Sequence, residues 1–308
     1  MKKFISFITA AAAVLAAMPM AANAEEAADE RTYSPTVYFT SEAKTPAISL
    51  ASGLLYVNTS AADADVVLPS QIAIKDQYKH VGQFTIKWTW DTDYVYTSGI
   101  RNPSADGKSA AYKGDDIYTD EKTGDKVDPV MYYVEDGEKM MGIDYSNSHI
   151  NPLEPSGAES DTNPVGLFDL NIAKNSPADY YSINFKTEQP YVTNIILRYA
   201  EDQSFRSIRP NGENAPSLKI AVTDRALGEV NGDGALDGRD ATDILSDYAL
   251  RSAGKESIFN KAQMISADVD GNQVVDANDA TNVLSYYAYA SSSKFDGTSL
   301  NDFVIKNQ

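Results

Sequence analysis

The sequence predicts a multi-domain chain: an all-β sandwich over residues 33–224, then a small all-α module over residues 225–308. Three observations support this fold class. Short β-rich runs separated by Gly, Pro, Asn and Asp fill the larger region, two similar acidic loops begin at Glu229 and Asp268, and a run with helical spacing follows each loop. A chain of 308 residues without cysteine is long enough for one substantial domain and a small one.

The N-terminal residues predict a secreted protein. Two lysines precede an apolar, alanine-rich run from Phe4 to Met18, and a small-x-small cleavage site ends at Ala24. We therefore expect residues 1–24 to be a signal peptide and residues 25–32 to be a flexible leader. The apolar run is short for a membrane span, so we expect an extracellular protein without a membrane anchor.

The larger region is predicted to form an antiparallel sandwich. Its β-rich runs are TVYF (36–39), GLLYVN (53–58), DVVLP (65–69), QFTIKWTW (83–90), PVMYYV (129–134), GLFDLNIA (166–173), YYSINFK (180–186), VTNIILRYA (192–200) and LKIAVTD (218–224). In one run apolar and polar residues alternate, which predicts a shared buried face for Phe84, Ile86, Trp88 and Trp90. The polar, glycine-dotted stretch 101–128 is expected to be a long loop or an insertion.

The smaller region contains an internal duplication. EVNGDGALDGRDATDILSDYALRSA begins at Glu229, and DVDGNQVVDANDATNVLSYYAYASS begins at Asp268. Each copy joins an acidic loop to a helical run, and we expect one helix face in each: Ile244, Leu245, Tyr248 and Ala249, and Val283, Leu284, Tyr287 and Ala288. So close a repeat predicts two copies of one structural unit.

Both loops have the pattern of a calcium-binding loop, in which alternate positions supply oxygen ligands and a carboxylate ends the loop. The predicted ligands of the first loop are Glu229, Asn231, Asp233, the carbonyl of Ala235, Asp237 and Asp240. Those of the second are Asp268, Asp270, Asn272, the carbonyl of Val274, Asp276 and Asp279. We therefore expect two Ca²⁺ ions; the alternative, a pair of solvated acidic turns, does not account for the duplicated spacing.

Each loop departs once from the usual pattern. Glu229 is one methylene longer than the usual opening Asp, and Gln273 occupies the sharp turn that Gly234 fills in the first loop. A non-glycine residue at positive φ costs about 1 kcal/mol, which several carboxylates around one divalent ion should outweigh. We therefore expect the second loop to bind calcium, but more weakly than the first.

The order loop, helix, linker, loop, helix from Glu229 to Ser291 resembles a dockerin, the module that plugs cellulosome components into cohesins. DATDILSDYA and DATNVLSYYAYAS, followed by GTSLNDF, resemble dockerins of rumen cellulosomal bacteria. The resemblance implies that a scaffoldin cohesin is bound by residues at each loop end and along each following helix. Carried onto this sequence, these are Arg239, Thr242, Leu245, Ser246 and Leu250, and Asn278, Thr281, Leu284, Ser285 and Tyr289. For Leu245 and Leu284 the helix core is an equal alternative.

The larger domain resembles a cohesin in the order of its segments. DVVLPSQIAI, QFTIKWTWDTDYV, GLFDLNIAKNSPADYYSINF and LKIAVTD are similar to successive strands and hairpins of that family. The resemblance implies a nine-strand jelly roll that binds dockerin-bearing proteins through one sheet face. The candidate contacts are Tyr94, Tyr96, Thr85, Lys87 and Thr89. A cohesin joined to a dockerin implies a non-catalytic adaptor scaffoldin for plant polysaccharide degradation, held at the cell surface through its partners.

Two other functions stay open for the larger domain. A carbohydrate-binding module is one, because the chain has 19 tyrosines and Trp88 and Trp90 could form a stacking platform. A glycoside hydrolase or esterase is the other, with Asp91 and Glu135 as an imaginable carboxylate pair, although no Gly-x-Ser-x-Gly motif occurs. The formal charge of −18 argues against nucleic acid and anionic membranes as partners.

Overall fold

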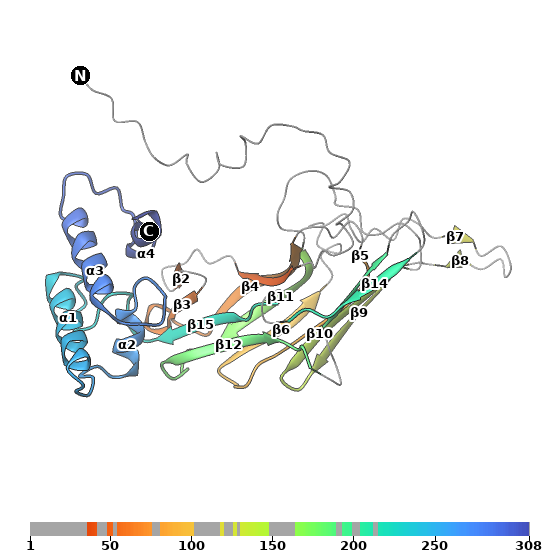
Figure 1. Cartoon of the computed structure of the whole chain (residues 1–308), viewed down its shortest axis with the longest axis horizontal. Coiled ribbons are helices and arrows are strands. Elements are labelled where there is room, and N and C mark those ends of the chain that lie inside the picture. Colours follow the sequence, from red (N-terminus) through yellow and green to blue (C-terminus); the bar gives the residue numbers. More distant parts are fainter. Residues whose placement is uncertain are drawn as a thin grey trace, which may run out of the picture. The chain divides into compact units, whose positions relative to one another are not determined.

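Two β-sheets enclose a buried apolar core in the computed structural model of the chain, and helices follow them (Figure 1). The structure describes residues 36–41, 48–51, 54–75, 81–101, 118–119, 126–127, 130–147, 164–188, 193–198, 204–211 and 215–307. The predicted signal peptide and leader, and most of the predicted loop 101–128, lie outside the described residues. The predicted order of a two-layer β-sandwich and then helices is confirmed.

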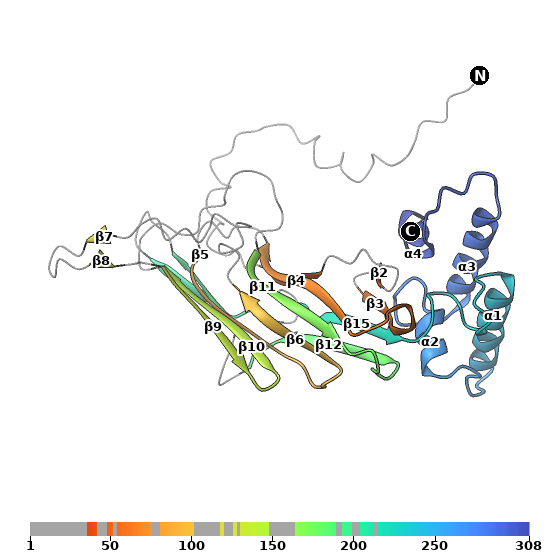
Figure 2. The ribbon, with the colours of Figure 1, turned by 180° about the vertical axis from the view of Figure 1, so that it is seen from behind.

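Among the described residues, the smaller sheet has four antiparallel strands. In spatial order they are β1 (Thr36–Ser41), β4 (Val66–Lys75), β11 (Pro164–Ile172) and β6 (Val95–Arg101). Of these, β4, β11 and β6 can be followed in Figure 2. β4 runs through Pro69, well beyond the end that the sequence predicted. Pairing with β1 begins at Ser70, whereas pairing with β11 includes Pro69. Among the described residues, β4 therefore has a strand neighbour on one side only at the proline, a position that tolerates its missing N–H.

The larger sheet has nine strands. Seven follow in the order β14 (Phe205–Ile208), β13 (Asn194–Arg198), β5 (Val81–Thr89), β12 (Asp179–Phe185), β15 (Leu218–Thr223), β3 (Leu54–Asn58) and β2 (Ile48–Ala51). β10 (Met140–Asn147) pairs with β5 and with β9 (Val130–Gly137). A short 3-10 helix (Thr59–Ala61) follows β3, and β7 (Tyr118–Thr119) pairs separately with β8 (Lys126–Val127).

One strand pair differs from the antiparallel arrangement that the sequence predicted. β15 and β3 are parallel, with Lys219 opposite Leu54 and Thr223 opposite Asn58. Parallel neighbours require a long crossover connection, and here nearly the whole sandwich separates the two strands along the chain. The expectation of a purely antiparallel sandwich is therefore wrong at this pair, because no local pattern marks a strand that returns beside the first part of the domain.

The predicted buried face of β5 is confirmed. Phe84, Ile86, Trp88 and Trp90 are 2%, 0%, 0% and 7% exposed. The indole Nε1 of Trp88 donates to Thr97 Oγ1 at 3.0 Å, so the polar atom of this buried ring is satisfied inside the core. Since both tryptophans belong to the core, they do not form the platform for sugar stacking that a carbohydrate-binding module would use.

The candidate contact residues of the sandwich do not form one surface. Thr85, Lys87 and Thr89 lie on β5 in the larger sheet, whereas Tyr94 and Tyr96 lie just before and within β6 in the smaller sheet. Lys87 is only 6% exposed. The sequence pattern assigned residues to faces within a strand, but it did not show that the chain changes sheets between Thr89 and Val95.

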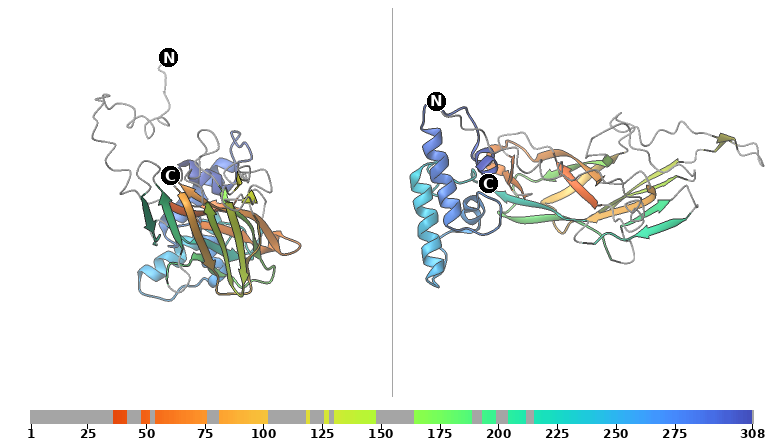
Figure 3. Two further views of the ribbon diagram at one scale, coloured as in Figure 1. Left: turned by 90° about the vertical axis from the view of Figure 1, so that its right-hand side faces the viewer. Right: turned by 45° about the horizontal axis from the view of Figure 1, so that its top comes forward.

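Four helices form the C-terminal region: α1 (Gly238–Ser252), α2 (Lys261–Ala267), α3 (Ala277–Ala290) and α4 (Leu300–Asn307). α1 and α3, which the repeats predicted, lie side by side (Figures 1 and 3). α2 in the linker and the terminal α4 were not predicted. Equivalent residues of the two repeats fill a second buried cluster: Val230 and Val269, Ala241 and Ala280, and Ile244 and Val283.

The change from strands to helices falls near the predicted domain boundary, since β15 ends at Thr223 and α1 begins at Gly238. Pro35–Gln308 nonetheless form one compact unit. In the part of the chain that the structure describes, no helix has the length and apolar character needed to cross a membrane.

Candidate metal loops and partner-binding face

The two loops share the hydrogen bonds of their last carboxylate, as a duplicated unit predicts, but they differ at the opening acid: Glu229 accepts from the N–H of Gly232, whereas Asp268 accepts from that of Gln273. The last carboxylate of each loop accepts three backbone N–H groups over 2.8–3.4 Å. Asp240 accepts from Val230, Asn231 and Asp237, and Asp279 accepts from Val269, Asp270 and Asp276. These bonds fold each loop around its final carboxylate, which is fully buried in both copies.

The end of each loop is also the beginning of a helix. Asp237 is the N-cap of α1 and Asp276 is the N-cap of α3, and both helices have a complete capping box. In each box the acid three residues later, Asp240 or Asp279, accepts the N–H of the N-cap residue. The Asp-x-x-Asp spacing therefore starts the helix and brings the final predicted ligand back toward the loop.

Three carboxylates converge in the second loop. Carboxylate oxygens of Asp268, Asp270 and Asp279 lie within 4.8 Å of one another. Burial raises the pKa of Asp268 to about 6 and that of Asp279 to about 7. Oδ1 of Asp268 is buried and accepts no hydrogen bond. Buried carboxylates with a free oxygen are unfavourable without a cation, so this donor set fits a hard divalent ion such as Ca²⁺.

The first loop places arginines beside its predicted ligands. Nη2 of Arg239 lies 2.8 Å from a carboxylate oxygen of Asp233 and 2.8 Å from one of Asp237. Nη1 of Arg225 lies 3.6 Å from Oε2 of Glu229. Three carboxylates of this loop are thus paired with guanidinium groups, and Arg239 bridges two of them. Among the described residues, the second loop holds the one acidic cluster close enough for a shared ion.

Gln273 adopts the turn conformation that the loop pattern requires. Its φ is 67°, and that of Gly234 in the first loop is 78°. The turn directs the N–H of Gln273 to Oδ2 of Asp268, at 2.9 Å. The expected backbone strain at Gln273 is therefore present, but it occurs in the loop whose carboxylates lie close enough together to share an ion.

Exchanging the turn residues tests this strain. Gln273→Gly is expected to stabilise the calcium-saturated helical module by about 1 kcal/mol, because glycine adopts positive φ without a steric penalty. The matched variant Gly234→Ala is expected to destabilise it by about the same amount; a Cβ there meets nothing within 4 Å, so only the backbone conformation changes. Denaturant unfolding measures both effects, and equal stabilities of Gln273→Gly and wild type would contradict the strain.

Leu245 and Leu284 are exposed at equivalent places in the two repeats. They are 45% and 52% exposed, and the neighbouring Tyr248 and Tyr287 are 37% and 41% exposed. The helix-core alternative is therefore wrong for both leucines, and of the helix faces predicted from apolar spacing only Ile244 and Val283 are buried. Each helix buries a narrow stripe instead, which on α1 is Ala241, Ile244 and Asp247, because it packs against its neighbours on one side only.

The hydroxyl residues predicted to meet a partner are exposed. Thr242, Ser246 and Thr281 donate to helix carbonyls four residues earlier, at 2.8, 2.8 and 2.7 Å. These bonds leave the hydroxyl oxygens at the surface, and Ser285 is exposed beside Leu284. Together with the two leucines, they give each repeat an exposed patch of one apolar and two hydroxyl side chains.

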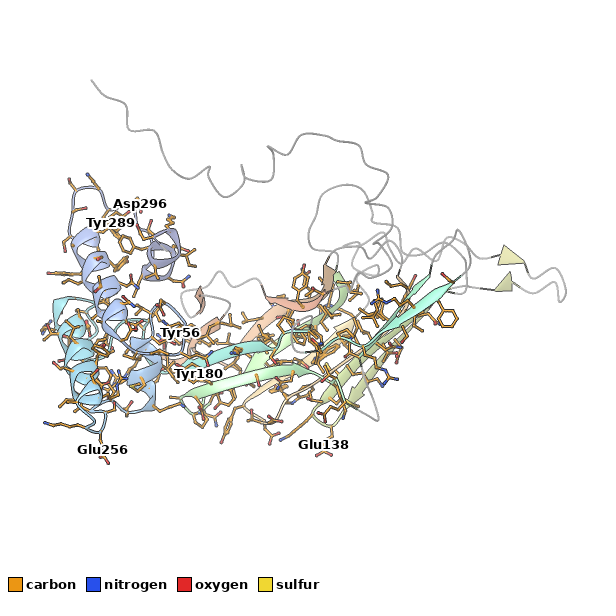
Figure 4. All side chains as sticks on the ribbon, in the orientation of Figure 1. Tyr56, Glu138, Tyr180, Glu256, Tyr289 and Asp296 are labelled. Atoms are coloured by element: carbon orange, nitrogen blue, oxygen red, sulfur yellow. The ribbon has the colours of Figure 1, made fainter. Side chains whose placement is uncertain are left out.

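The other predicted partner residues differ in their exposure and in their contacts. Asn278 is exposed and Leu250 is half-buried, while Arg239 is exposed but paired with two aspartates. Tyr289 makes contacts inside the module: its hydroxyl donates to Asp296 at 2.6 Å, both residues being labelled in Figure 4. Its ring also stacks on Phe303, with 5.3 Å between the ring centroids. The hydroxyl of Tyr289 is therefore already committed to an internal contact.

Comparisons with known proteins give cohesin modules as structural neighbours. No protein-family model and no curated protein sequence matches the chain. The seventh ScaB type I cohesin from Pseudobacteroides cellulosolvens is 8% identical, with a TM-score of 0.36 over 63% of this chain and 96% of that one. A type III cohesin module of the ScaE cell-surface anchoring scaffoldin from Ruminococcus flavefaciens is 12% identical, with a TM-score of 0.31 over 61% and 87%.

A third solved neighbour belongs to a type I cohesin–dockerin complex from Clostridium thermocellum. It is 8% identical, with a TM-score of 0.33 over 61% of this chain and 99% of that one.

Proposed function

We propose that the chain is a secreted, non-catalytic adaptor of a cellulosome. The helical module acts as a dockerin and docks on a scaffoldin cohesin, and the sandwich acts as a cohesin and receives a dockerin-bearing protein. The observation that carries the proposal is the duplicated loop–helix unit, whose second loop gathers three buried or half-buried carboxylates. The extracellular location follows from the predicted signal peptide.

The loops are proposed to hold two Ca²⁺ ions through the ligands that the repeats predict. Calcium supplies the positive charge that buried carboxylates require. The second loop is proposed to bind the tighter ion, because Asp268, Asp270 and Asp279 are already gathered there. In the first loop a cation must displace Arg239 from Asp233 and Asp237. This order reverses the one expected from Gln273 alone.

The scaffoldin cohesin is proposed to bind the exposed patches of α1 and α3. Each patch centres on an exposed leucine and is bordered by hydroxyl groups, the combination of apolar centre and polar rim found in protein interfaces. Leu284 lies close to the beginning of α1, since a Cβ on Gly238 would be 3.9 Å from its Cδ1. Side chains of the second helix thus border the start of the first.

The dockerin-bearing partner is proposed to bind the outer face of the larger sheet at β5, β10 and β12. Thr85 donates to Asp144 across β5 and β10, on the side opposite the buried Phe84. On β12, Asn184 contacts Ser182 and accepts from Ser217 at 2.6 Å. This hydrogen-bonded polar face on a rigid sheet is suited to bind a partner through side chains. Tyr94 and Tyr96 belong to the other sheet and are not part of it.

The two alternative functions, a carbohydrate-binding module and a glycoside hydrolase or esterase, have less support in the structure. The two tryptophans proposed for sugar stacking are in the core. Of the imagined carboxylate pair, Asp91 is exposed at the surface, and the side chain of Glu135 lies outside the described residues. The adaptor therefore remains the function that the described residues favour.

Substituting the two exposed leucines tests the docking face. Leu245→Asp combined with Leu284→Asp is expected to weaken binding to scaffoldin cohesins by on the order of 100-fold, because central apolar contacts dominate interfaces and buried charge opposes them. Calorimetry against a panel of cohesins, in calcium and in chelator, measures the effect. The control is Ile305→Asp, at a residue of α4 that is 49% exposed, which should bind as wild type does. Equal losses in both variants, or no cohesin bound by the wild type, would refute the proposed docking.

A further inference from the structure

The helical module packs directly on one end of the sandwich. Leu54, Tyr56 and Ala221 from β3 and β15 form a buried cluster with Ile265 of α2, and all four are at most 4% exposed. Beside this cluster Nζ of Lys261, at the start of α2, lies 3.0 Å from Oδ1 of Asp179. α2 ends at Ala267, immediately before the second loop begins at Asp268, so its packing holds the start of that loop beside the sandwich.

A tyrosine of the sandwich reaches the first ligand of the second loop. The hydroxyl of Tyr180, on β12, donates to Oδ2 of Asp268 at 3.4 Å (Figure 4). The N–H of Gln273 donates to the same oxygen at 2.9 Å. Oδ1 of Asp268 is left buried without a hydrogen bond. Two donors thus fix one oxygen of the carboxylate and leave the other free for a cation.

A second tyrosine of the sandwich supports the first loop less directly. The hydroxyl of Tyr56 donates to the backbone carbonyl of Arg225 at 2.9 Å (Figure 4). The guanidinium of Arg225 in turn lies 3.6 Å from Glu229 and donates to the carbonyl of Val230 at 3.3 Å. Of these two tyrosines, Tyr180 alone contacts a predicted ligand itself, so among the described residues the sandwich acts most directly on the second loop.

We propose that Tyr180 is a positioning residue of the second calcium loop, and that calcium binding there is coupled to the packing of α2 on the sandwich. This inference rests on the proposed calcium function. A hydrogen bond to a ligating carboxylate fixes its orientation and strengthens metal binding. Coupling between two sites is reciprocal, so calcium in this loop must also stabilise the contact between the two parts of the chain.

A conservative substitution in the full chain tests the positioning role. Tyr180→Phe removes only the hydroxyl and is expected to lower the calcium affinity of the second loop by on the order of tenfold, leaving the first loop unchanged. Tyr181→Phe is the matched control, because the hydroxyl of Tyr181 donates to Pro177 within the sandwich, at 2.9 Å. Calorimetric titration with calcium measures both steps, and Asp233→Ala and Asn272→Ala identify which step belongs to which loop.

The outcomes separate this inference from the function on which it rests. Calcium binding that Tyr180→Phe leaves unchanged, or a loss shared equally by both loops, overturns the positioning role and leaves the calcium function standing. A wild-type chain that binds no calcium overturns both.

Hydrogen exchange measures the coupling itself. Calcium is expected to increase the protection of backbone amides around Asp179–Tyr181 and in α2 of the wild type, and this increase should shrink in Tyr180→Phe. A merely structural role of the tyrosine would change protection equally with and without calcium. Protection that rises in α3 while β12 and α2 stay unchanged shows that the loop binds calcium independently of the sandwich, and it contradicts the proposal.

Discussion

Removing calcium from the full chain with a chelator is expected to lower the apparent stability of the helical module by about 4 kcal/mol for each of the two proposed sites, relative to calcium at a thousandfold excess over the dissociation constant of that site. Asp268 and Asp279 are buried and close together, so the module without an ion retains unfavourable carboxylates. Circular dichroism should show helix lost on chelation and regained when calcium is restored. Unchanged helix content and melting temperature in chelator would contradict the calcium loops.

A control variant tests whether the calcium response is specific to the loops, and a fragment tests whether the sandwich stabilises the helical module. Asp302→Ala removes an acid of α4 outside both loops and should keep the full calcium response. A fragment that begins at residue 225 should be less stable in calcium than the same region in the full chain, because it loses the contacts of Ile265 with Leu54 and Tyr56. A fragment as stable as the intact chain would show that these contacts contribute nothing.

Replacing Asp247 by alanine is expected to destabilise the helical module by about 3 kcal/mol. The carboxylate is fully buried in α1 and accepts from Arg251 Nε at 2.6 Å, Ser257 Oγ at 2.6 Å and the N–H of Ile258 at 2.8 Å. Arg251 also donates to the carbonyl of Val275 in the second loop, at 2.6 Å. The substitution therefore leaves several donors without their acceptor. It also removes the carboxylate that holds Arg251 in place to bind the second loop.

The pKa of Asp247 gives this prediction a pH dependence. Burial disfavours the charged form, but hydrogen bonds from Ser257 and Arg251 outweigh it and lower the pKa of Asp247 below its ordinary value. The unfolded carboxyl takes up a proton first as the pH falls, so the stabilisation is complete at neutral pH and is lost as the pH falls through the lowered pKa.

Denaturant unfolding of Asp247→Ala and Asp243→Ala measures the effect. Asp243 is half-buried on the same helix, and its replacement should change the free energy of unfolding by less than about 0.5 kcal/mol. If Asp247→Ala is as stable as Asp243→Ala at neutral pH, the buried network does not support the module.

Features that depend on neighbouring residues could be predicted from the sequence. The alternation around Trp88 defined a buried strand face, because successive side chains of a strand point to opposite sides. The spacing of acids predicted both loops and a helix after each, and the structure adds that Asp237 and Asp240 cap the first of these helices. Repetition of that spacing at Asp276 and Asp279 made the assignment specific.

Features that depend on distant packing could not be predicted. Leu245 fits a buried helix stripe by its spacing, and its exposure follows only from the side on which α1 meets its neighbours. Tyr180 is 88 residues from the carboxylate that it contacts, so no local pattern connects the two. The ion pair between Arg239 and Asp233 could not be predicted either. An arginine at the end of a loop gives the same sequence pattern whether its side chain binds a partner protein or an acid of its own loop.

The central claim of the proposed adaptor function is that one chain binds a scaffoldin cohesin and a dockerin-bearing protein at the same time. Its most direct test is sequential capture: a scaffoldin cohesin from the panel is immobilised, the full chain is bound to it in calcium, and a series of dockerin-bearing proteins is passed over the captured chain. The proposal predicts that at least one dockerin binds the captured chain, and that a chelator then releases the whole assembly. A chain that is captured but receives no dockerin, or that binds a plant polysaccharide instead, would contradict the adaptor.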